Sequence, residues 1–140
     1  MKIYEFNTAK GVYKFELEEI KTQFHAHPAI EVDFSENGSF DIETPASGYQ
    51  GIRFAIIYAN VPHRVRSQSG CIHFLMLECT PAFLQEAVTP LQLRLEEDIF
   101  VEASDGDKFA MFKEIFQTYD KRKIPLSAAP RIQLCLAYLE

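Results

Sequence analysis

The sequence predicts one mainly β domain, a small barrel or two-sheet sandwich over residues 1–80, followed by a tail of two or three α-helices over residues 81–140. Three observations predict this class. About seven or eight short segments that alternate apolar and polar residues are separated by Gly, Pro, Asn and Ser before residue 80. From Thr80 onward the apolar residues recur at helical spacing instead. A chain of 140 residues with a 47% hydrophobic fraction forms one sizeable core.

Composition and charge exclude several classes of protein. A net charge of -6 argues against a grip on nucleic-acid phosphates, and the short basic run 121–123 fits a solvated helix end. The 3 cysteines form no C-x-x-C pair and indicate buried thiols in a reducing compartment. No signal segment begins the chain, and the apolar run 54–61 is too short to cross a bilayer. We therefore expect a soluble, cytoplasmic protein without membrane contact.

The predicted strands follow one another at short spacing. The first two form a hairpin with Gly11 in its turn, and the stretch 45–51 is assigned to a loop because Pro, Ser and Gly dominate it. In chain order the strands are predicted at residues 1–7, 12–20, 24–34, 39–44, 53–58, 63–67 and 71–79.

The stretch 24–34 is predicted to be the central strand. Side chains alternate between the two faces of a strand, so His25, His27, Glu31 and Asp33 share one face. The opposite face is mostly apolar, which indicates that a second sheet or a helix covers it.

The helical tail begins at Thr80, a good N-cap followed by Pro81. An acidic connection with a short strand at 99–101 leads to helices capped by Asp107 and Ser127. Their apolar stripes pack either on the barrel itself or on a second copy of the chain. The predicted dimer contacts are Phe112, Ile115, Phe116, Ile132, Cys135, Leu136 and Leu139. Because no stop signal follows residue 139, we expect a trimmed chain or a final helix that continues elsewhere.

Three histidines and one carboxylate form the candidate site. His25, His27 and Glu31 share a strand face, and His63 follows an apolar strand and Pro62. This set is a plausible open site for a divalent transition metal such as Fe, Mn, Zn or Ni. The alternative is a polar barrel face whose histidines are satisfied by one another, by water or by an organic ligand.

The spacing His25-x-His27-x3-Glu31-x6-Gly38 resembles the first motif of the cupin superfamily, whose second motif supplies its third histidine where His63 stands. The sequence V-P-H-R-V over 61–65, the T-P-x-F-L sequence at 80–84 and the two amphipathic helices look like the N-terminal sensing and dimerisation domain of AraC-family transcription regulators. The resemblance implies a cupin-like double-stranded β-helix, a small-molecule effector inside the barrel and a homodimer held by the helices. It also implies DNA binding through a helix-turn-helix part outside this chain.

Three functions compete on this basis. The first is the effector-binding domain, not an enzyme, with a small polar molecule such as a sugar or an acid in the barrel. Its ligand-binding residues are predicted to be His25, His27, Glu31, Asp33, Arg53, Tyr58, His63 and His73. The second is a metal-dependent cupin enzyme of dioxygenase or isomerase type, disfavoured because Tyr58-Ala59-Asn60 replaces the Pro-x-Gly turn of the second motif. The third is a dimerising domain without ligand, disfavoured by the cost of burying the polar face without partners.

Overall fold

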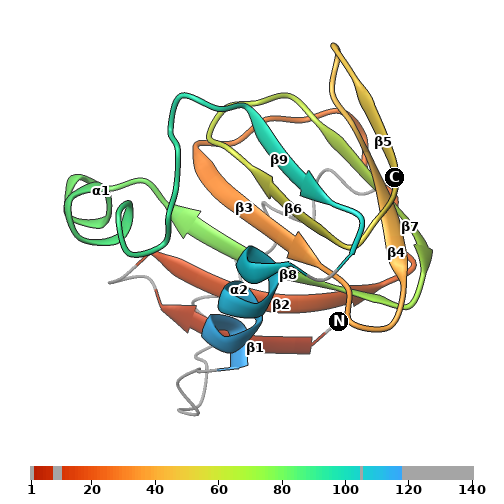
Figure 1. Ribbon diagram of the computed structural model, residues 1–140, viewed down its shortest axis with the longest axis horizontal. Coiled ribbons are helices and arrows are strands. Elements are labelled where there is room, and N and C mark those ends of the chain that lie inside the picture. Colours follow the sequence, from red (N-terminus) through yellow and green to blue (C-terminus); the bar gives the residue numbers. More distant parts are fainter. Residues whose placement is uncertain (1, 8–10, 105, 118–140) are drawn as a thin grey trace.

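Two antiparallel sheets enclose a core in this computed structural model, which describes residues 2–7, 11–104 and 106–117 (Figure 1). The larger sheet has the strand order β1-β2-β8-β3-β6-β9, and the smaller sheet has the order β5-β4-β7. The described elements are β1 (Lys2–Asn7), β2 (Val12–Glu18), β3 (Ala29–Phe34), β4 (Ser39–Glu43), β5 (Gly48–Ile52), β6 (Phe54–Ile57), β7 (Arg64–Ser69), β8 (Cys71–Glu78), α1 (Pro81–Ala87), β9 (Ile99–Glu102) and α2 (Asp107–Gln117). The predicted mainly β class, a barrel-like pair of sheets with two helices, is confirmed, although β9 joins the larger sheet only after α1.

β3 lies inside the larger sheet, hydrogen-bonded to β8 on one side and β6 on the other. Its side chains alternate between two buried faces. Ile30, Val32 and Phe34 are fully buried on the outer face, while Glu31 and Asp33 are buried on the inner face between the sheets. The predicted central position of this strand is therefore confirmed.

Apolar side chains fill the space between the two sheets. Phe15 on β2 stacks on its cross-strand neighbour Phe74 on β8, with 5.1 Å between ring centroids. The buried residues of this inner core are Tyr13, Phe15, Ile20, Phe40, Ile42, Ile52, Ala55, Ile57, Val65, Ile72, Phe74 and Met76. The barrel interior is thus a packed core over most of its length.

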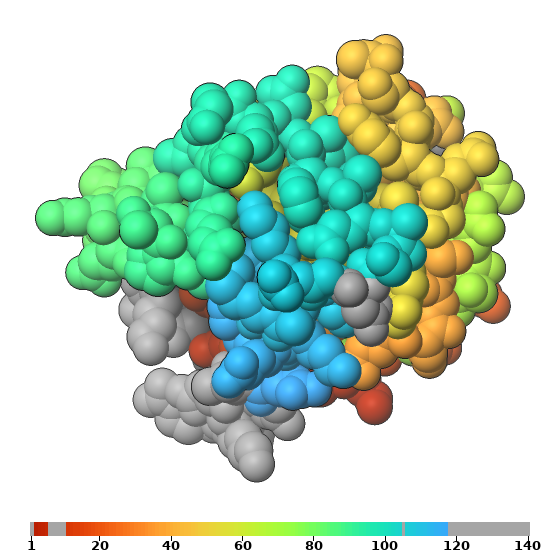
Figure 2. Space-filling model, in the orientation of Figure 1, coloured from red at the N-terminus to blue at the C-terminus, as the bar shows by residue number. Residues whose placement is uncertain are grey.

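A second core lies on the outer face of the larger sheet, where α2 packs across β3 and its neighbours (Figure 1). In the space-filling view, α2 and the segment from α1 to β9 cover this face (Figure 2). Phe109, Phe112 and Phe116 are buried there, and Ile115 packs at its edge. Of the two alternatives for this stripe, a dimer contact or packing on its own barrel, the structure has the second for Phe112 and Phe116, which belong to the core of one chain. The predicted contacts Ile132, Cys135, Leu136 and Leu139 lie outside the described residues.

Two segment assignments from the sequence are wrong. The central strand begins at Ala29 rather than at residue 24, and His25 forms only an isolated bridge with His63. The predicted loop 45–51 instead contains most of β5, which pairs with β4 around the Thr44–Ser47 turn. Pro, Ser and Gly give this stretch the composition of a loop, whereas the pairing depends on a neighbouring strand.

The helix and strand beyond residue 80 begin where the sequence predicts. The Oγ1 of Thr80 accepts a hydrogen bond from the backbone N–H of Phe83 at 3.1 Å, and Pro81 opens α1. The short strand predicted at 99–101 is β9, which pairs with β6. None of the helices among the described residues is long and apolar enough to cross a membrane.

Gly38 lies where the turn before β4 meets the turn before β8. A Cβ atom at this position would stand 1.8 Å from the backbone oxygen of Ser69. Only glycine permits this approach. Gly38, the last residue of the spacing that begins at His25, is therefore required for packing in the turn.

Candidate metal centre

Three separate segments supply the candidate ligands. His25 and His27 lie in the irregular stretch before β3, Glu31 lies on β3, and His63 directly precedes β7. The backbone N–H of His25 donates to the His63 oxygen at 3.0 Å, and the N–H of His63 donates to the His25 oxygen at 2.9 Å. The N–H of Asn60 donates to the His27 oxygen at 2.7 Å. Backbone hydrogen bonds therefore position both histidines of the irregular segment against the loop that carries the third.

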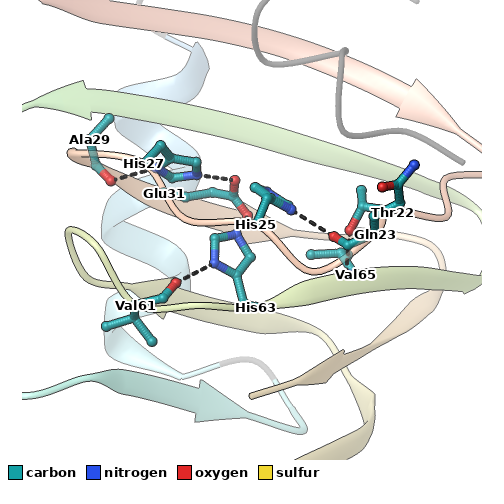
Figure 3. Close-up of polar contacts among 9 residues, drawn as sticks. All are labelled: Thr22, Gln23, His25, His27, Ala29, Glu31, Val61, His63 and Val65. Carbon is teal, nitrogen blue, oxygen red and sulfur yellow. Dashed lines mark hydrogen bonds and ion pairs between the residues drawn. The ribbon is translucent and has the colours of Figure 1, made fainter. Parts of the chain in front are cut away.

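The four side chains converge at one end of the barrel (Figure 3). One ligand atom from each of His25, His27, Glu31 and His63 lies within 4.8 Å of the others. The two carboxylate oxygens of Glu31 divide between two rings, with Oε1 3.2 Å from the Nε2 of His27 and Oε2 3.6 Å from the Nε2 of His63. The structure thus brings together the three histidines and the carboxylate that the sequence predicts as a set.

All three imidazoles are held through the same ring nitrogen. Each Nδ1 lies at hydrogen-bond distance from the backbone oxygen of a residue two positions away: Gln23 for His25 at 2.8 Å, Ala29 for His27 at 2.9 Å and Val61 for His63 at 2.7 Å. A carbonyl oxygen only accepts, so each Nδ1 carries the proton. In the neutral ring the lone pair is then on Nε2, and metal-binding histidines are commonly fixed by such an outer hydrogen bond. The donor set fits a transition metal.

Glu31 and His63 determine the charge of the site. Burial by itself would raise the pKa of Glu31, but His63, followed by His27, holds it well below its usual range. Burial by itself would lower the pKa of His63, but the Glu31 carboxylate outweighs this and raises it. Glu31 Oε2 and His63 Nε2 are buried and make no hydrogen bond to any described residue. The pair therefore requires a proton or another cation between them.

Asp33 is the next inward-facing residue of β3 after Glu31. It is fully buried, and neither carboxyl oxygen has a hydrogen-bond partner among the described residues. Burial, and then the neighbouring Glu31 carboxylate, raises the pKa of Asp33 well above its usual range. Asp33 extends the polar face inward from the cluster without belonging to the four converging residues.

Two other predicted ligand-binding residues point away from the cluster. Tyr58 follows Ile56 on the outer face of the larger sheet, and its hydroxyl accepts a hydrogen bond from the backbone N–H of Arg94 at 3.1 Å. The Arg53 guanidinium donates to the backbone oxygen of Ser35 and lies over the ring of Phe109. The prediction that both line the inner pocket is not supported.

His73 also lies on the outer face. Its ring stacks on Phe34 and meets Phe116 edge-on, with 4.9 Å between centroids in each pair. Strand alternation explains this placement, because the neighbouring residues Ile72 and Phe74 point inward. His73 therefore contacts α2 rather than the candidate ligands.

A small cavity touches the cluster from inside the barrel. Its volume is about 30 Å³, against the roughly 300–1,000 Å³ of pockets that hold drug-sized organic ligands. Its lining residues are Phe15, Leu17, Ile20, Thr22, His25, His27, Glu31, Val65, Phe74 and Met76. The expected sugar or acid inside the barrel does not fit the space next to the cluster.

Two parts of this site could not be predicted from the sequence: the backbone carbonyls that orient the imidazoles and the apolar residues beside the cluster. The carbonyl oxygens that orient the imidazoles belong to the backbone, so side-chain identity carries no signal for them. Phe15, Phe74 and Met76 line the cavity, but in the sequence they are typical of ordinary core positions on alternating strands. Their place beside the cluster follows from the pairing of β2 with β8, which is a long-range contact.

No protein-family model matches the sequence, and no curated protein matches it significantly. Among solved structures, apo ToxT K231A from Vibrio cholerae strain SCE256 is similar with a TM-score of 0.57 and 12% identity, over 95% of this chain and 55% of ToxT. A second ToxT crystal form gives a TM-score of 0.53 and 10% identity, over 90% of this chain and 52% of ToxT. An RmlC-like cupin from Shewanella frigidimarina aligns with 59% of this chain at 13% identity and a TM-score of 0.37.

The two ToxT similarities define the fold class. The chain has the fold of the N-terminal domain of ToxT, an AraC-family regulator, and it spans about half the length of that protein. At these identities the likeness extends to the fold, and the function depends on the site itself.

Proposed function

We propose that this chain is the ligand-sensing domain of an AraC-type transcription regulator and that it senses a divalent transition metal. The fold shared with half of ToxT supports the first part. The second part depends on one observation: one ligand atom from each of three histidines and one carboxylate lie within 4.8 Å of one another, while every Nδ1 is at hydrogen-bond distance from a backbone carbonyl.

The ligand set and the available space both favour an ion over an organic effector. His25, His27 and His63 would bind through neutral imidazoles and Glu31 through a carboxylate, a set that suits Fe, Mn, Zn or Ni. Bound there, such an ion supplies the positive charge between Glu31 and His63. An ion also fits beside a cavity of about 30 Å³, where a sugar does not.

A metal would act by favouring one arrangement of the segments that supply its ligands. A ligand shifts a regulator only if it binds one conformation more tightly than another. The turn before His63 is hydrogen-bonded to the stretch before β9, because the backbone N–H of Tyr58 donates to the Asp98 oxygen at 3.0 Å. That stretch leads through β9 to α2. In this proposal the other half of the regulator binds DNA in the cytoplasm, and the domain forms a homodimer.

A metal-dependent cupin enzyme is the second candidate. The observation that favours it is the donor count, because four protein ligands leave open positions on a six-coordinate metal. A bound ion would supply Lewis-acid chemistry there. The two candidates differ in a binding readout: only a sensor changes the DNA affinity of the full-length regulator when the metal is added.

The test is metal analysis of the protein purified without added metal. We expect close to one ion per chain, lost in His27→Ala and in Glu31→Gln. His73→Gln is the matched control, because it changes a histidine on the opposite face of the sheet and should keep the ion. Full metal content in His27→Ala would refute the proposed site, and metal-independent DNA binding by the intact regulator would refute the sensing role.

A further inference from the structure

An apolar wall bounds the candidate metal centre on its inner side. Besides the cluster residues and Thr22, every residue that lines the cavity is apolar. The Thr22 hydroxyl already accepts a hydrogen bond from the backbone N–H of Val65 at 2.8 Å. A molecule that enters this cavity therefore meets the metal ligands and little else that is polar.

The wall is part of the inner core rather than a loose rim. Phe15 and Phe74 are 3% exposed and stack with an interplanar angle of 10°. They are directly paired across β2 and β8, and Met76 lies two residues further along β8. Cores packed in this way resist expansion, since displaced side chains lose contacts that no other group replaces.

We propose that this wall limits the exogenous ligand of a bound ion to about three heavy atoms or fewer, such as water, hydroxide or azide, and that it excludes larger co-ligands such as imidazole or oxalate. The inference depends on the proposed metal site and specifies what else that site accepts. A cavity needs about 10–15 Å³ to hold one water molecule, so about 30 Å³ has room for about two or three. An ion held by His25, His27 and Glu31 would itself occupy part of that space.

The experiment uses the protein loaded with Co²⁺, whose visible absorption reports its coordination. Azide is the small probe, while imidazole and oxalate are the larger ones. We expect azide to change the spectrum at millimolar concentration and both larger molecules to leave it unchanged. A spectral change with imidazole or oxalate at the same concentration, with the ion still bound, would overturn the inference while leaving the metal site intact. Absence of Co²⁺ binding would instead overturn the proposed function, and this inference with it.

A substitution in the wall provides the second arm. Met76→Ala removes three heavy atoms beside the cavity, so imidazole should bind the Co²⁺ form about tenfold or more tightly than it binds the unmodified protein. Met111→Ala is the matched control, because Met111 lies on α2 against the outer core and does not line the cavity. Equal imidazole binding by the two variants would contradict a role for the wall.

Discussion

The backbones of His25 and His63 hydrogen-bond to each other in both directions, at 3.0 and 2.9 Å, and their rings lie 4.3 Å apart between centroids. This bridge lies outside the regular strands and places a candidate ligand of the irregular segment against one that directly precedes β7. The site is therefore preorganised by main-chain contacts, which lowers the conformational entropy that a bound metal would have to offset.

Removal of metal should lower the stability of the protein. A ligand present at about 100 times its dissociation constant stabilises the folded state by about 2.7 kcal/mol. We expect a chelator to reduce the melting temperature of the metal-loaded protein by several degrees. The His63→Ala variant should melt at the same temperature with and without chelator. A chelator effect that persists in this variant would locate the metal elsewhere.

The metal-free protein should be most stable in mildly acidic solution. The ionised Glu31, whose pKa is lowered, contributes stability above its ordinary value of 4.5 and loses it as the pH falls through the folded-state pKa. Protonated His63, whose pKa is raised, contributes fully below 6.5 and loses that contribution as the pH rises through its folded-state pKa. Between these limits both contributions are present.

Urea denaturation as a function of pH tests this dependence. In Glu31→Gln the raised pKa of His63 should relax, so the loss of stability above about pH 6.5 should flatten. Burial is the largest cause of the lowered pKa of His25, and loss of the Glu31 charge lowers that pKa further, which affects stability only below about pH 6.5. Identical pH profiles for the unmodified protein and Glu31→Gln would show that the interaction between Glu31 and His63 does not stabilise the folded state.

The set of candidate ligands was predictable from their spacing, whereas the backbone contacts that position them were not. Two histidines at i and i+2 and a glutamate six positions after the first are visible in the sequence. The prediction that all three share one strand is wrong for His25 and His27, since β3 begins only at Ala29. They reach the site through the His63 bridge, a contact between residues 38 positions apart that local patterns do not encode.

Local sequence patterns also do not determine which residues lie on the inner face of the barrel and which lie on the outer face. Alternation correctly predicts two buried faces for β3. Alternation gives no indication of which face of the sheet meets α2. Tyr58 and His73 were therefore expected beside Glu31, whereas the structure has Tyr58 in the outer core and His73 at its edge, against Phe116. Which face is inner depends on how the strands pair over long distances.

Asp33→Asn should stabilise the protein at neutral pH. The buried carboxyl has no hydrogen-bond partner among the described residues, and its raised pKa means that its stability contribution is lost as the pH rises above 3.8 toward the folded-state value. An amide carries no charge to desolvate, so we expect a gain of about 1–3 kcal/mol by urea denaturation at pH 8. A loss of stability there would mean that Asp33 is ionised and paired.

Phe112→Ala should destabilise the fold of each chain rather than separate two copies. Phe112 is fully buried against the larger sheet, and truncation of a buried phenylalanine costs about 3–5 kcal/mol. Gln117→Ala, at an exposed position of the same helix, is the control and should change stability by less than about 0.5 kcal/mol. Calorimetry and light scattering together distinguish the outcomes. A change in mass without a change in melting temperature would restore Phe112 to an interface.

Lys14 links the edge of the larger sheet to the last turn of α2. Its Nζ lies 2.9 Å from the Glu5 carboxylate on β1 and donates to the backbone oxygen of Ile115 at 2.7 Å. The side chain is 3% exposed, so the charge is almost entirely buried. Lys14→Met would leave the Glu5 carboxylate without this partner and should cost about 3–5 kcal/mol.

A double-mutant cycle separates the ion pair from the helix contact. Glu5→Gln combined with Lys14→Met removes both charges, so the double variant should regain much of the stability lost in Lys14→Met alone. The contact with Ile115 stays broken, and the amides of the last turn of α2 should still exchange faster by hydrogen exchange. Unchanged exchange in both variants would show that the contact between Lys14 and Ile115 does not hold the last turn of α2.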